Sequence, residues 1–126
     1  MERPKTIFCD IDGTLWNHVG GDQDQAIWQG QELLPNTKEA IDKWDRLGYR
    51  IILTTGRKES ARESTVKQMR RAGINYDQLI MGFGGGDRIL INDRKKDSNR
   101  DTAYVINLTR DKGLEGFFTN SINTSV

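Results

Sequence analysis

The stretch Ile7-Phe8-Cys9-Asp10-Ile11-Asp12-Gly13-Thr14-Leu15 decides the fold. It predicts a buried strand that begins at Thr6 and ends at two aspartates two residues apart. Side chains two apart on a strand point to the same side, so Asp10 and Asp12 are expected to converge on one reacting centre. Gly13 allows the sharp turn out of the strand. Ligands of open α/β sheets bind at the carboxyl ends of strands, and we therefore expect the functional site here.

Two later apolar runs also end in residues suited to phosphate or metal. Thr55-Gly56-Arg57 follows the run Ile51–Leu53. A hydroxyl just before a helix, together with the free N–H groups of its first turn, forms an anion site, and a following arginine is suited to clamp phosphate oxygens. Asn92-Asp93 follows the run Ile89–Ile91 and adds a carboxylate.

Strand and helix patterns alternate, which predicts an α/β fold with a central parallel sheet of about five strands. Asn36, with Glu39 three residues later, predicts a capping box at the start of the first helix. Gly48 ends that helix. The other predicted elements are strands at 6–10, 49–53, 79–81, 89–91 and 103–108, and a helix at 58–72.

The length of 126 residues predicts one domain, which we expect to span residues 1–119. Residues at about 16–32 are predicted to form a small flap beside the site, in which Trp16, His18 and Trp28 either contact ligand or simply pack or meet solvent. The polar residues 120–126 are expected to form a frayed tail.

Composition makes several classes of protein less favoured. The formal net charge of +1 gives no basic field that favours nucleic acid. Cys9 is the single cysteine, so no internal disulfide framework exists. No apolar run of about 18 residues and no signal-peptide core occur, and we expect a cytoplasmic protein with no membrane contact.

Taken together, the three motifs resemble motifs I, II and IV of the haloacid dehalogenase (HAD) superfamily, and they occur in the same order. The resemblance covers nearly the whole chain. It implies a three-layer Rossmann-like fold and, since most members are phosphohydrolases, dependence on Mg²⁺. The gaps between the motifs leave no room for a cap domain, so the resemblance is to a short, capless member with an open site.

The resemblance also implies roles for individual residues. Asp10 would attack phosphorus to form an aspartyl-phosphate, and Asp12 would act as general acid and base. Mg²⁺ would be held by Asp10, Asp93 and the backbone carbonyl of Asp12. The residues expected to contact the phosphate are Gly13, Thr14, Thr55, Gly56, Arg57 and Lys95.

One part of the family pattern is missing. The lysine of motif III, which the family places shortly before motif IV, has no counterpart in Gly82–Arg88. Arg57, Arg88, or Lys95 with Lys96 are the candidate replacements.

Three functions follow from these expectations. The first is a phosphatase that acts on a small phosphorylated metabolite such as a sugar phosphate. The second is a nucleic-acid 3′-end phosphatase, since such enzymes share the Ser/Thr-Gly-Arg form of motif II. The third is a phosphate-binding module without catalysis, which the missing lysine favours. Whether the protein forms a homo-oligomer stays open.

Overall fold

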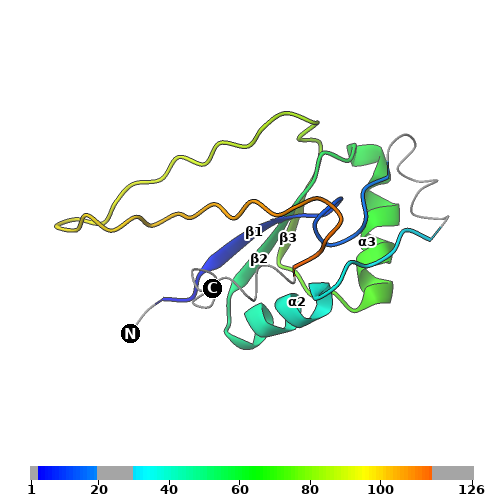
Figure 1. Ribbon diagram of the computed structural model, residues 1–126, viewed down its shortest axis with the longest axis horizontal. Coiled ribbons are helices and arrows are strands. Elements are labelled where there is room, and N and C mark those ends of the chain that lie inside the picture. Colours follow the sequence, from blue (N-terminus) through cyan, green and yellow to red (C-terminus); the bar gives the residue numbers. More distant parts are fainter. Residues whose placement is uncertain (1–2, 20–29, 115–126) are drawn as a thin grey trace.

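A parallel sheet of three strands, in the order β1-β2-β3, forms the centre of the computed structural model (Figure 1). The structure describes residues 3–19 and 30–114, so the predicted tail, Trp28 and most of the predicted flap lie outside the described residues. The elements are β1 (Thr6–Asp10), α2 (Thr37–Arg46), β2 (Arg50–Thr54), the 3₁₀ helix η1 (Glu59–Ala61), α3 (Arg62–Ala72) and β3 (Gln78–Ile80). No helix in these described ranges has the length and apolar character needed to cross a membrane.

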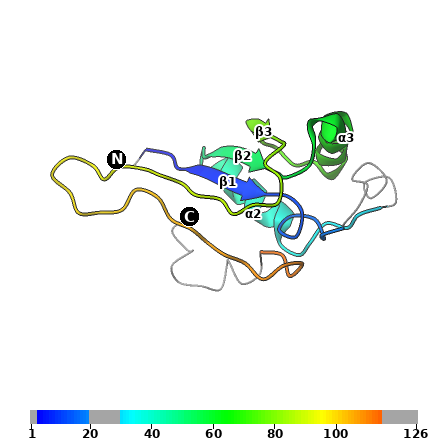
Figure 2. The same ribbon diagram turned by 90° about the horizontal axis from the view of Figure 1, so that it is seen from above.

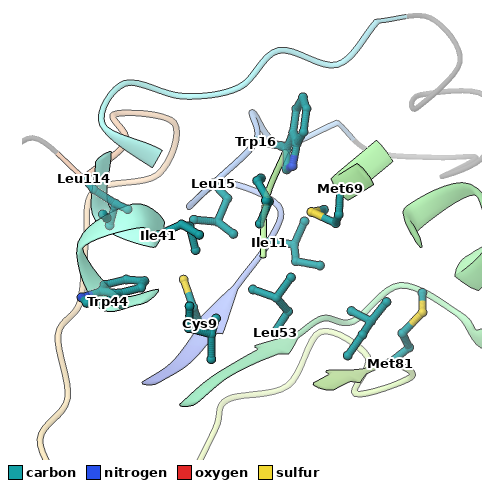
Figure 3. Close-up of a cluster of buried hydrophobic side chains, with 14 of the residues drawn as sticks. Cys9, Ile11, Leu15, Trp16, Ile41, Trp44, Leu53, Met69, Met81 and Leu114 are labelled. Atoms are coloured by element: carbon teal, nitrogen blue, oxygen red, sulfur yellow. The ribbon is translucent and has the colours of Figure 1, made fainter. Parts of the chain in front are cut away.

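One face of the sheet carries the hydrophobic core. Cys9 lies beside Leu53 and Leu53 beside Leu79 in the parallel register, so these side chains share a face. They pack with Ile41 and Trp44 of α2 and with Met69 of α3 (Figure 3). The opposite face is more open, because Phe8 is 58% exposed and Ile80 is 37% exposed.

The helices agree with the predicted periodicity but not with every predicted end. Ile41 and Trp44 are buried as expected, whereas Leu47 is exposed beyond the end of α2. The predicted capping box is wrong: Asn36 has a left-handed backbone (φ 64°) and its side chain caps no N–H group. At the other helix, Gly73 ends α3 as predicted, with φ 68° and its N–H directed to the last carbonyls.

The prediction of about five strands is wrong for the described residues, since the runs at 89–91 and 103–108 do not join the sheet. Residues 89–105 instead form an arm that extends away from the sheet (Figures 1 and 2). Ile89 and Ile91 are 86% and 89% exposed. A parallel strand needs cover on both faces from crossover helices, and the polar residues 94–102 form none.

The arm is held together by side chains rather than by a strand ladder. The Asn92 amide donates to the Thr102 hydroxyl at 2.6 Å, and that hydroxyl donates to the Asp93 carbonyl. Arg94 and Asp101 form an ion pair at 3.1 Å. The returning chain meets the body again at Ile106 and Leu108, which pack against the core.

The burial of Leu53 gives a first testable prediction. Leu53 is fully buried in the central strand, and Leu53→Ala is expected to lower the free energy of unfolding by about 3 kcal/mol. Phe8→Ala on the exposed face of β1 is the matched control, with an expected loss below about 1 kcal/mol. Denaturant unfolding measures both, and equal losses would mean that the core does not lie on the Leu53 face.

Candidate active site

A cavity of about 840 Å³ lies where β1 and β2 end, and Asp10 and Asp12 both line it. The sequence prediction that these two side chains converge is therefore consistent with their placement. The other lining residues are His18, Gly56, Arg57, Lys58, Ser60, Ala61, Gly84, Gly85, Gly86, Asp87, Arg88 and Arg110.

The loop after β1 is a tight turn that fixes the two carboxylates. Gly13 has φ 86°, a conformation that residues with a side chain rarely adopt, and its N–H donates to the Trp16 carbonyl at 2.6 Å. The N–H groups of Thr14 and Leu15 donate to the Ile11 carbonyl. Ile11 and Leu15 are fully buried, so the turn that carries Asp12 is anchored in the core.

Asp10 reaches the cavity, yet the protein around it removes enough water to raise the pKa of its carboxyl. The negative charge of Asp12 raises the pKa further. Hydrogen bonds from the Ile11 N–H and from Thr14, together with the positive charge of Arg88, oppose the rise. Asp10 is therefore a carboxylate whose charge the described residues compensate only in part, a setting that suits a bound cation.

Asp12 is held by Arg57 through two parallel hydrogen bonds. Arg57 Nε donates to Asp12 Oδ2 at 2.9 Å and Nη2 donates to Oδ1 at 2.8 Å. The remaining N–H groups of the guanidinium donate to Thr65, Gln68 and Gln31. All five donors are thus used, and Arg57 is 3% exposed. Arg57 was expected to clamp phosphate, but here it has no donor left for a ligand.

The segment after β3 folds across the end of β2. Gly82 donates its N–H to the Arg57 carbonyl at 2.7 Å, and Phe83 donates to the Thr55 carbonyl at 3.2 Å. A Cβ at Gly56 would lie 2.5 Å from the Gly84 carbonyl oxygen, so only glycine allows this approach. The glycine-rich segment is therefore a wall of the cavity.

The other predicted site residues are not all brought together. Thr55 is buried and its hydroxyl accepts from the Arg57 N–H, so it does not line the cavity. Asp93 and Lys95 lie on the arm and do not line it either. Within the described ranges, no three His, Cys, Asp or Glu side chains are grouped to hold a metal ion, so Asp93 is not assembled with Asp10 and Asp12.

Among the cavity residues that were not predicted, two are basic. Lys58 directly follows motif II, and that adjacency could have suggested it. Arg110 comes from a distant part of the chain and carries no local signal. Of the predicted flap residues, His18 lines the cavity, whereas Trp16 is buried in the core. Burial raises the pKa of the Cys9 thiol to about 12, so this neighbour of Asp10 stays uncharged at neutral pH.

The raised pKa of Asp10 predicts an effect of pH on stability. A folded-state pKa above the unfolded value means that stability is lost as pH rises through the folded pKa. Asp10→Asn removes this loss, so in metal-free buffer the variant is expected to melt above the wild type at pH 7. Well below about pH 4 the Asp10 carboxyl of the wild type is protonated in both the folded and the unfolded state, so the difference in Tm should vanish. Calorimetry across pH checks this, and a lower Tm at pH 7 would contradict it.

The Arg57–Asp12 pair gives a second prediction on stability. Arg57→Met leaves the Asp12 charge without its partner and is expected to lower the free energy of unfolding by about 3–5 kcal/mol. Arg57→Met combined with Asp12→Leu removes both charges and should recover most of the loss. Additive losses in a double-mutant cycle would show that the pair is not coupled.

The family model described as haloacid dehalogenase-like hydrolase matches residues 7–82, more than half of the chain. An uncharacterized protein of Methanocaldococcus jannaschii, MJ0015, is 38% identical over 56 residues, which are 44% of this chain and 56% of that protein.

Two solved structures share the fold. A chain of the Pnkp1/Rnl/Hen1 complex is 32% identical with a TM-score of 0.55, over 75% of this chain and 31% of that one. D,D-heptose 1,7-bisphosphate phosphatase from B. bronchiseptica, complexed with magnesium and phosphate, is 20% identical with a TM-score of 0.53, over 66% of this chain and 52% of that one. The chain thus spans about a third to just over half of the length of these relatives. The match over residues 7–82 shows that the chain belongs to the haloacid dehalogenase-like hydrolases.

Proposed function

We propose that this chain is a phosphomonoesterase in which Asp10 is the nucleophile. The observation that carries the proposal is the placement of Asp10 and Asp12 in one cavity whose other walls include cationic side chains and glycine backbone. A carboxylate that attacks phosphorus divides a slow hydrolysis into the formation and the breakdown of an acyl-phosphate. Family membership supports the same chemistry.

Asp12 is proposed to move the protons. Both of its oxygens accept hydrogen bonds from Arg57, a state suited to taking a proton from the water that breaks the aspartyl-phosphate. To protonate the leaving oxygen in the first step, Asp12 must first take up a proton from solvent, and one of these bonds is released to make room for it. Arg57 is therefore a positioning residue that orients Asp12, and the charge of the phosphate falls to other cations.

Arg88 is the proposed replacement for the motif III lysine. Its charge already acts on Asp10, and it lines the cavity, which Lys95 does not. Its guanidinium donates to the carbonyls of Gly84 and Gly86 and lies 5.0 Å from the centre of the Phe83 ring. The side chain of Lys58, in the same cavity, makes no hydrogen bond or ion pair within the described residues and adds a second cation.

Mg²⁺ is the proposed cofactor. Asp10 and the backbone carbonyl of Asp12 would hold it, because one or two carboxylates with phosphate and water oxygens satisfy this ion. The partly compensated charge of Asp10 fits a cation there. When bound, Mg²⁺ would neutralise charge between the carboxylate and the phosphate. Asp93 remains a proposed ligand that the described arrangement does not bring to the cavity.

A small phosphorylated metabolite such as a sugar phosphate remains our first proposal for the substrate. The 3′-phosphate end of a nucleic acid is the second candidate. Similarity at 32% identity to a chain of the Pnkp1/Rnl/Hen1 complex, of which a related structure is described as an RNA repair complex, favours the second. The net charge of +1 favours the first.

The test is turnover of a sugar phosphate and of a 3′-phosphorylated oligonucleotide with Mg²⁺ or with EDTA. We expect Mg²⁺-dependent release of phosphate that Asp10→Asn lowers by at least about a thousandfold. Asp45→Asn, at an exposed position of α2, is the matched control and should keep full activity.

Loss of activity in both variants, or activity that survives Asp10→Asn, would contradict the assignment of the nucleophile. No turnover of either substrate would favour the module without catalysis. The substrate with the higher kcat/KM would decide between the first two functions.

A further inference from the structure

The turn at residues 109–112 is bound to the loop that carries Asp12. The Asp111 N–H donates to the Gly13 carbonyl at 2.9 Å. The Asp111 carboxylate accepts from the His18 N–H at 2.6 Å. These two bonds reach the loop after β1 at two separate positions, Gly13 and His18, so the turn is held against it at two points.

The other side of the same turn is fixed to the core. Leu114 is buried, and its N–H donates to the Pro35 carbonyl at 3.0 Å. Gly113 packs so tightly on Pro35 that no Cβ would fit. Arg110 therefore projects from a rigid platform with an anchor on each side.

The Arg110 side chain crosses Gly13 and reaches the cavity. A Cβ built on Gly13 would lie 3.2 Å from Arg110 Cγ and 3.8 Å from Arg110 Nε. The absence of a side chain at Gly13 thus makes the path for Arg110. In residues 3–19 and 30–114, no hydrogen bond or ion pair holds its guanidinium. An arginine with free donors on a rigid support is suited to bind a phosphate through two parallel bonds.

This cation is separate from the one that serves the reacting phosphate. Arg88 is held by the carbonyls of Gly84 and Gly86 on the glycine-rich wall, whereas Arg110 enters the cavity over Gly13. Arg57 has all its donors engaged within the protein. Arg88 is the cation proposed above for the phosphate that Asp10 attacks, so Arg110 is left for a different anionic group.

We propose that Arg110 binds a second phosphate of the substrate, next to the one that is hydrolysed. The inference rests on the proposed phosphatase function and narrows its substrate class to phosphomonoesters that carry a further phosphate group. That group can be the second phosphate of a small bisphosphate or the neighbouring phosphodiester of an oligonucleotide 3′ end. The two sources share the chemistry that Arg110 recognises.

Paired substrates test the proposal. The pairs are glucose 1-phosphate with glucose 1,6-bisphosphate, and thymidine 3′-phosphate with the 3′-phosphorylated thymidine dinucleotide. In at least one pair, kcat/KM is expected to be about tenfold to a hundredfold higher for the member with two phosphates. Arg110→Ala should bring that ratio to about one, and Arg110→Lys should keep part of it.

Lys112→Ala is the matched control, since Lys112 lies on the same turn, is exposed and does not line the cavity. It should keep the wild-type ratio. A wild-type ratio near one in both pairs, or a ratio that survives Arg110→Ala, would overturn the proposal. Thermal unfolding confirms that each variant is folded, and Arg110→Gln replaces Arg110→Ala if that variant is not.

Binding separates this inference from the proposed function. Calorimetric titration of each substrate into Asp10→Asn, with and without Arg110→Ala, needs no turnover. Tighter binding of the doubly phosphorylated member, lost with Arg110→Ala, would support the role of Arg110 even if the wild type hydrolyses nothing. Turnover with no such difference in binding or in kcat/KM would leave the phosphatase standing and overturn the role of Arg110.

Discussion

The buried pair of Arg57 and Asp12 is the interaction on which the site depends. A charged guanidinium at 3% exposure is tolerated only when every donor is satisfied, and the partners of Arg57 come from four parts of the chain. They are the loop after β1, the segment before α2, and two turns of α3. The pair therefore joins the ends of two strands to a helix, and the orientation of Asp12 is a property of the whole fold.

Because all the donors of Arg57, the arginine of motif II, are engaged within the protein, other side chains supply the positive charge that a ligand in the cavity would contact. Arg88 reaches it from the glycine-rich segment and Arg110 from the turn bound to Gly13. In both cases the access depends on a residue without a side chain: Gly56 admits the Gly84 carbonyl, and Gly13 admits Arg110. Steric room at backbone positions thus decides which cations face the two carboxylates.

The sequence predicts the strands and helices whose bounds are set by local patterns. The bounds of β1 match the prediction, and those of β2, β3 and α3 differ from it by a few residues, because apolar periodicity and terminal glycines define them. The pattern at Asn36 failed, since a left-handed backbone turns its side chain from the helix. Ile89–Ile91 has the composition of a strand, but composition does not show whether a neighbouring helix will cover it.

The same difference between local patterns and long-range packing separates the site residues that were predicted from those that were not. Asp10 and Asp12 were found because their spacing alone makes them converge. The partner of Arg57 lies 45 residues away, and Arg110 reaches the cavity only through bonds made by Asp111 and Leu114. No pattern within a short window encodes such contacts, since they depend on how distant segments pack.

The outer edge of β1 has a consequence for how the sheet can grow. In the described residues β1 pairs only with β2, which leaves one row of backbone donors and acceptors open beside Phe8. Natural sheets usually protect such a margin, because it is a template for a further strand. A strand that paired in parallel with this edge would have its carboxyl end beside Asp10. Residues that follow such a strand could therefore reach the cavity.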